Sequence, residues 1–99
     1  MWDVGFHFSN LWFAGQQRNW PLARFYFNET VSHARWAIRI RPMRQDPDGN
    51  PVDLQGILDG ISNGVFDRLE AAIDAQDPEQ FEEWYRRVSD DGGILLLMP

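Results

Sequence analysis

Apolar side chains recur at helical spacing through almost the whole chain, and this periodicity is the feature that most constrains the fold. The repeat is clearest where Leu54, Leu58 and Ile61 follow one another by three or four residues. Helix starts are also marked, because Asn19 precedes Pro21 and Asp77 precedes Pro78, which places a capping side chain just before a first-turn proline. The sequence therefore predicts an all-α chain.

We expect four helices, over about residues 2–14, 19–41, 54–73 and 78–91. Gly15 and the polar run of residues 16–18 end the first. Three glycines interrupt the third, whose first part is then a short separate helix ending near Gly60. Met43 to Pro51, rich in Pro, Asp and Gly, reads as a loop, and no strand is expected. Short connections make consecutive helices antiparallel, so residues 1–99 are predicted to form one domain, an antiparallel four-helix bundle with a short apolar C-terminal tail.

Composition narrows the classes of function. The 99 residues include no cysteine, which excludes disulfides, thiolate metal sites and covalently attached haem. Residues 1–45 carry six arginines and two acids, whereas residues 46–99 carry three arginines and thirteen acids. This net acidic chain without a basic cluster argues against nucleic acid as a partner, and the charge difference favours packing of one half of the domain on the other.

Neither a membrane span nor an export signal is expected. The longest apolar run, Ile94 to Met98, has five residues, whereas a span needs roughly 18. The N-terminus carries Asp3 in place of a basic region and has no apolar signal core.

The second predicted helix is apolar on two sides. One side carries Trp36 and Ile40, and the nearly opposite side carries Val31 and Ile38. A helix of this kind is normally central in a bundle or shared with a partner. We therefore expect Trp36 and Ile40 to be largely buried on one side and Val31 or Ile38 to be covered on the other.

Five tryptophans and seven phenylalanines are more than the core of so short a chain requires. Aromatic residues beyond the needs of a core favour a surface that binds a partner protein or a second copy. The apolar tail, Ile94 to Met98, is expected to be buried against the bundle or another chain, because five consecutive apolar residues left in water would invite aggregation. The candidate partner-binding residues are Trp12, Trp20, Trp36, Ile94, Leu95, Leu96 and Leu97.

Glu29 and His33 are the strongest polar candidates for a functional site, because they are four residues apart and both lie on an apolar stripe of the second predicted helix. Ionisable groups on such a stripe are costly unless they are paired. One interpretation is that they satisfy each other within the helix. The other is a metal site of two histidines and one carboxylate, with His7 of the first helix as third ligand. The second interpretation requires His7 to face this stripe.

Two blocks of sequence resemble a known family. Residues 7–15 read HFSNLWFAG, residues 19–23 read NWPLA, and Phe25 and Glu29 follow. This resembles the opening of small bacterial periplasmic four-helix proteins related to c-type cytochromes, in which the pattern is roughly H-x-x-x-L-W-F-A-G-x-x-x-N-W-x-L-A-x-F-x-x-x-E. Residues 69–77, with Phe81 and Tyr85, are similar to the third and fourth helices of that family.

The resemblance implies a helical bundle, the positions of His7 and Glu29, and a periplasmic origin. Many members carry a Cys-x-x-Cys-His haem-attachment motif after the fourth helix. Here Val88 and Ser89 lead through residues 90–93 directly to the apolar tail. The chain thus lacks the motif, and covalent haem is not implied.

The sequence as a whole predicts a haem-free binding or accessory module that docks on a partner protein or on itself, with no cofactor and no catalytic residues. The alternative, from another class, is a protein related to electron transfer that holds a divalent metal or non-covalent haem through His7, Glu29 and His33.

Overall fold

The computed structural model describes residues 3–40, 43–45 and 47–91, without the side chains of residues 3, 43, 44 and 91. In chain order its elements are α1 (Asp3–Gln16), α2 (Trp20–Ile40), β1 (Met43–Gln45), β2 (Pro51–Asp53), α3 (Leu54–Ile61), the π-helical turn η1 (Ser62–Phe66), α4 (Asp67–Ala75) and α5 (Pro78–Asp91).

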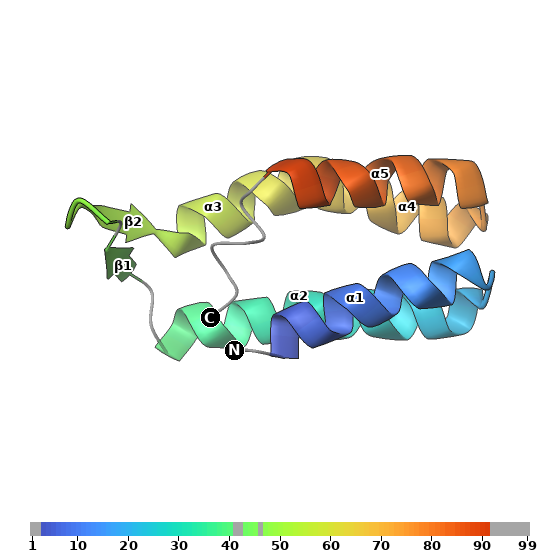
Figure 1. Cartoon of the computed structure of the whole chain (residues 1–99), viewed down its shortest axis with the longest axis horizontal. Coiled ribbons are helices and arrows are strands. Elements are labelled where there is room, and N and C mark those ends of the chain that lie inside the picture. The colour runs from blue at the N-terminus through green and yellow to red at the C-terminus, as the bar shows by residue number, and fades with distance from the viewer. Residues whose placement is uncertain (1–2, 41–42, 46, 92–99) are drawn as a thin grey trace.

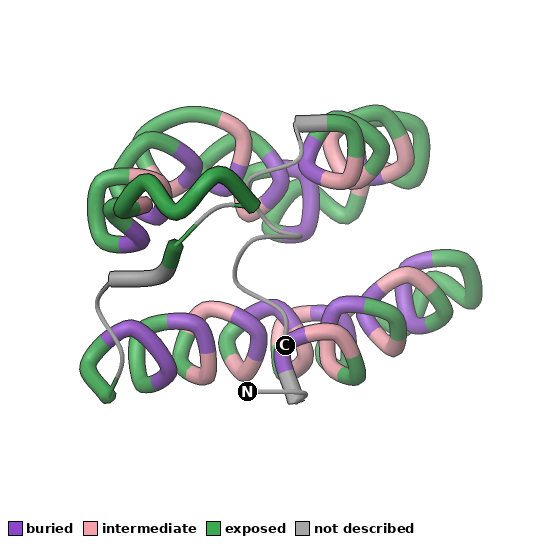
Figure 2. The backbone as a smooth tube through the Cα atoms, turned by 60° about the vertical axis from the view of Figure 1, so that its left-hand side comes forward, coloured by how far each residue is buried: buried purple, intermediate pink, exposed green. Residues whose placement is uncertain are grey.

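The helices form two layers (Figure 1). Antiparallel α1 and α2 make one layer, and α3, α4 and α5 make the other, with α2 packed on α3 and α4 and α1 packed on α5. The buried segments lie on the sides of the two layers that face each other (Figure 2). The prediction of an all-α, antiparallel four-helix bundle is confirmed, with α3, η1 and α4 together taking the place of the third helix.

The predicted helix starts are also confirmed. The Oδ1 atom of Asn19 accepts from the backbone N–H of Leu22 at 3.3 Å. The Oδ1 atom of Asp77 accepts from the N–H groups of Glu79 and Gln80 at 3.1 and 3.2 Å. Each cap satisfies a first-turn donor that the helix itself leaves without an acceptor.

The first part of the third helical segment is a short separate α-helix, as predicted, because α3 ends at Ile61, next to Gly60. Helix α3 runs into η1, where one extra residue is accommodated, and continues as α4 without leaving helical geometry. The glycines weaken helix propensity but do not break the helix, since Leu58, Ile61 and Phe66 all bury their side chains in the same core.

The prediction of a loop over Met43 to Pro51 is wrong in part. Strands β1 and β2 form a short antiparallel hairpin in which Met43 lies opposite Asp53 and Gln45 lies opposite Pro51. Gly49 turns the chain with φ of 83°, a conformation that glycine adopts at little cost. Strands of three residues carry too little alternation to be recognised from sequence.

The prediction for α2 is wrong on one side. Ile38 is buried and Val31 packs against the core, as expected. Trp36 and Ile40, however, are 55% and 62% exposed. Small residues explain the difference, because Ala23 and Ala34 are fully buried on the inward side and let α2 approach its neighbours closely there.

Helix α1 ends at Gln16, where Gly15 and the polar run after it predict its end, and Gly15 lies in the last turn against the ring of Phe81. A Cβ atom at position 15 would lie 2.2–2.3 Å from three atoms of that ring. Phe81 is 2% exposed, and its ring also lies near those of Trp12, Trp20 and Tyr85. Beyond Gln16 the chain turns away at Arg18, which adopts a left-handed conformation with φ of 58°.

We expect Gly15→Ala to lower the free energy of unfolding by about 1–3 kcal/mol, because the new methyl group has no space against a buried ring. Gly60→Ala is the matched control, since a Cβ atom there meets nothing within 4 Å. That control is expected to be neutral or to stabilise the fold by up to about 1 kcal/mol. Urea unfolding measures both, and equal effects of the two substitutions would contradict the close contact.

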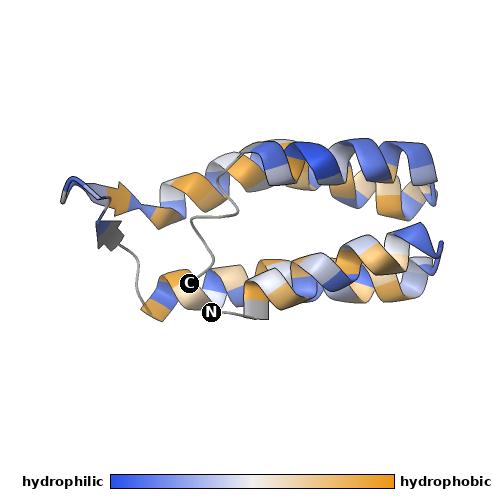
Figure 3. Cartoon of the chain, viewed as in Figure 1, coloured by the Kyte–Doolittle hydropathy of each residue, from blue (hydrophilic) through white to orange (hydrophobic). Residues whose placement is uncertain are grey.

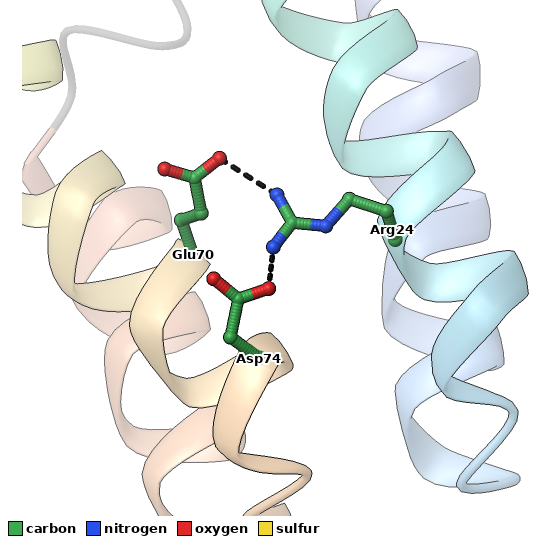
Figure 4. Close-up of polar contacts among 3 residues, drawn as sticks. All are labelled: Arg24, Glu70 and Asp74. Atoms are coloured by element: carbon green, nitrogen blue, oxygen red, sulfur yellow. Dashed lines mark hydrogen bonds and ion pairs between the residues drawn. The ribbon is translucent and has the colours of Figure 1, made fainter.

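An arginine joins the two layers on one side of the bundle (Figure 4). The Arg24 guanidinium of α2 donates to Glu70 of α4 at 2.7 Å and also pairs with Asp74. Arg24 belongs to the basic half of the chain, whereas Glu70 and Asp74 belong to the acidic half. The contact therefore supports the expectation that the charge difference lets one half face the other.

We expect Arg24→Gln to lower the free energy of unfolding by roughly 0.5–1 kcal/mol at low salt and by less in molar salt, because the three side chains are partly exposed and screened. Arg35→Gln, at an exposed arginine on the same helix, is the control and should have no such salt dependence. A loss that is independent of ionic strength would argue against an electrostatic contribution.

A second contact between the layers uses Tyr85 of α5. Its hydroxyl donates to the carbonyl oxygen of Phe8 in α1 at 2.7 Å, and the two rings stack at 4.3 Å. Burial raises the pKa of the Tyr85 hydroxyl well above its usual value near 10, so the group stays a neutral donor. The predicted apolar tail, Ile94 to Met98, lies outside the described residues.

Candidate metal site on the α1–α2 layer

His7, Glu29 and His33 lie together on the layer formed by α1 and α2. Residues 4, 8 and 11 of α1 point into the core, so position 7 falls on the flank of that helix, beside α2. Glu29 and His33 are one helical turn apart on α2 and therefore share a face. The condition that the sequence left open, that His7 faces this stripe, is met.

The three side chains are close enough to act on one ligand. One nitrogen or carboxylate oxygen from each lies within 4.8 Å of the other two. The Nε2 atom of His33 lies 3.2 Å from the Oε2 atom of Glu29, and the rings of His7 and His33 have centroids 4.7 Å apart. We refer to His7, Glu29 and His33 as the histidine–glutamate cluster.

The cluster contains a buried polar atom, the Nδ1 atom of His7, that makes no hydrogen bond among the described residues. A buried polar atom without a partner costs free energy, and the great majority of such atoms in folded proteins are satisfied. Glu29 and His33 are only partly buried, with side chains 35% and 29% exposed, so the cluster opens to the surface.

Aromatic rings surround the cluster on both helices. The His7 ring lies between Phe6, 5.3 Å away in an edge arrangement, and Tyr26 of α2 at 5.9 Å. Tyr26 in turn contacts Phe25 at 5.3 Å. Phe6 and Phe25 are 55% and 51% exposed, so the cluster lies between two apolar side chains that face solvent.

The donor set fits a transition metal. Two imidazoles and one carboxylate suit Zn²⁺ and Fe²⁺ among the divalent first-row ions. Ligand atoms that share a tetrahedral ion at about 2.1 Å lie roughly 3.4 Å apart. The His33–Glu29 pair is close to this spacing at 3.2 Å, and a ligand atom of His7 lies within 4.8 Å of both partners.

The predicted partner-binding residues are placed differently from one another. Trp20 packs against the core, and Trp12 contacts Phe81 and Tyr85, whereas Trp36 faces solvent. Residues 94–97 lie outside the described part of the chain. Trp12 also lines an open pocket of about 470 Å³ between α1 and α5, together with Ser9, Phe13, Tyr85, Arg86, Ser89 and Asp90.

The exposed large apolar side chains of the described residues lie on α1 and α2, whose ribbons mix hydrophobic and hydrophilic positions (Figure 3). They are Phe6, Phe13, Leu22, Phe25, Trp36 and Ile40. Helix α5 is mostly hydrophilic by comparison, and pairs of arginine and glutamate cover it. Sequence reasoning missed Phe6 and Phe13 as surface residues. The signal available was their spacing of seven residues, which is two helical turns and puts both on the side of α1 away from its core positions.

Comparison with protein-family models, with curated proteins and with solved structures found no match. In the described part of the chain, no helix has the length and apolar character needed to cross a membrane. The resemblance to periplasmic cytochrome-related proteins therefore stays a prediction, as does non-covalent haem.

We expect Glu29→Gln and His33→Gln each to change the free energy of unfolding of the metal-free protein by less than about 0.5 kcal/mol, because a partly exposed polar pair one turn apart contributes little. Leu69→Ala, at a fully buried position, is the reference and should cost about 2–5 kcal/mol. Unfolding in the presence of a chelator makes the comparison. A loss of more than about 2 kcal/mol in the free energy of unfolding for either polar substitution would favour the interpretation that Glu29 and His33 only satisfy each other within the helix.

Proposed function

We propose that the protein is a metal-binding helical bundle that holds one divalent transition-metal ion through His7, Glu29 and His33. The observation that carries the proposal is the buried Nδ1 atom of His7, which has no partner among the described residues and belongs to a ring adjacent to His33. A structural pair of Glu29 and His33 accounts for those two residues but leaves His7 unexplained.

The composition of the cluster supports zinc as the first ion to test. Zinc takes imidazole nitrogen and carboxylate oxygen in tetrahedral sites, and it does not require a redox partner. Three protein ligands leave the fourth position to water or another small ligand. The protein's residues would thus hold and orient the ion, and the partly exposed Glu29 would neutralise part of its charge.

A second candidate function, docking on a partner protein or on a second copy, is favoured by a separate observation. Six large apolar side chains on α1 and α2 are 37–62% exposed. Exposed apolar surface of this extent on a small domain is typical of an interaction site.

We expect the tag-free chain to bind one zinc ion per chain with micromolar or tighter affinity, measured by calorimetry or by competition with a chromogenic chelator. Its only histidines are His7 and His33, so an affinity tag has to be removed first. His7→Ala, His33→Ala and Glu29→Gln should each weaken binding roughly tenfold or more, since each removes a ligand.

Glu82→Gln is the matched control, because it removes an exposed carboxylate that pairs with an arginine one turn away on α5. It should leave zinc affinity unchanged. Absence of zinc binding by the wild-type chain, or binding that survives both histidine substitutions, would refute the proposal.

A further inference from the structure

The cluster and the exposed apolar side chains occupy the same face of the molecule. On α2, six residues spaced by three or four positions form one stripe: Leu22, Phe25, Glu29, His33, Trp36 and Ile40. On α1, Phe6 contacts His7, and Phe13 lies two turns further along the same side. We call the six exposed apolar residues of the two helices (Phe6, Phe13, Leu22, Phe25, Trp36 and Ile40) the outer face.

We infer that a second copy of this chain covers the outer face and encloses the histidine–glutamate cluster, so that metal binding and dimerisation strengthen each other. The metal part of this inference rests on the proposed function. The dimer part rests on the size of the face, on its charge and on the position of the cluster within it.

The size of the face is sufficient for a dimer. An aromatic side chain carries roughly 150–250 Å² of surface, so Phe6, Phe13, Phe25 and Trp36, each 51–60% exposed, present about 400–500 Å² per copy. Leu22 and Ile40 bring the apolar area to about 600 Å². Two copies would bury about 1,200 Å² of side chain alone, which reaches the range of stable interfaces.

The charge of the face favours a second copy over a charged partner protein. Of the six residues in the α2 stripe defined above, Glu29 alone carries a formal charge. By contrast, α5 exposes acidic residues and arginines that would oppose self-contact and attract a charged partner. Two outer faces can therefore meet without appreciable repulsion between like charges.

The position of the cluster couples the two events. A second copy brings the rings of Phe6 and Phe25 together around the cluster and displaces water from it. Without an ion, the partly exposed Glu29 carboxylate would lose water while the buried His7 nitrogen would still have no partner among the described residues, which opposes dimerisation. A bound ion satisfies those atoms and so favours the dimer, and by linkage the dimer binds the ion more tightly.

Sedimentation velocity of the full chain, with zinc or with a chelator, tests the inference. We expect a species of twice the 11.6 kDa chain mass, and a dimer dissociation constant roughly tenfold lower with zinc. Trp36→Glu should abolish association, because it places a charge in the apolar interface. Ala71→Glu, which adds the same charge at an exposed site on α4, is the matched control and should associate as the wild type does.

The outcomes separate this inference from the proposed function. A wild-type chain that stays monomeric with and without zinc overturns the dimer, and so does a dimer that persists in Trp36→Glu. A monomer in which Trp36→Glu strongly lowers the melting temperature shows that the chain's own residues cover the face. If zinc binds through the two histidines but does not shift the dimer equilibrium, the coupling fails while the proposed function stands.

Discussion

The close contact between the Phe81 ring and the backbone of Gly15 fixes how the two layers of this bundle meet. The ring occupies the place where a side chain of α1 would otherwise project, so α1 can pack tightly against α5 at this one position. Tyr85, one turn further along α5, then reaches the carbonyl of Phe8. These two contacts set the rotation of α1 about its own axis, and that rotation places His7 beside α2 instead of in the core.

Much of the fold was predictable because its signals are local. The side chains of Asn19 and Asp77 cap helices that begin at prolines or next to them, and the apolar repeats need no knowledge of distant neighbours. The short hairpin and the path through η1 were missed because each depends on a few residues whose conformation is decided by packing. The packing role of Gly15 was missed for the same reason, since it is visible only once Phe81 is beside it.

The part of the site that lies on one helix was predictable, whereas the part that depends on how α1 and α2 face each other was not. The spacing of Glu29 and His33 puts them on one face of any helix, whereas the position of His7 depends on which side of α1 faces α2. The error over Trp36 and Ile40 has a related cause. Periodicity shows that α2 has two apolar sides, but it cannot show which side is covered within the chain. Here the covered side is the one with the small residues Ala23 and Ala34, which are fully buried.

The placement of the cluster has a thermodynamic logic. A metal site deep in so small a core would cost much of the apolar burial that holds the chain together, whereas the outer side of the α1–α2 layer makes no such demand. On that side Glu29 and His33 keep partial contact with water. Among the described residues, the core between the layers is largely apolar, and its Thr30 and Tyr85 hydroxyls donate to the carbonyl oxygens of Tyr26 and Phe8. The fold and the site are thus stabilised by different parts of the molecule, so a substitution in one is expected to leave the other largely intact.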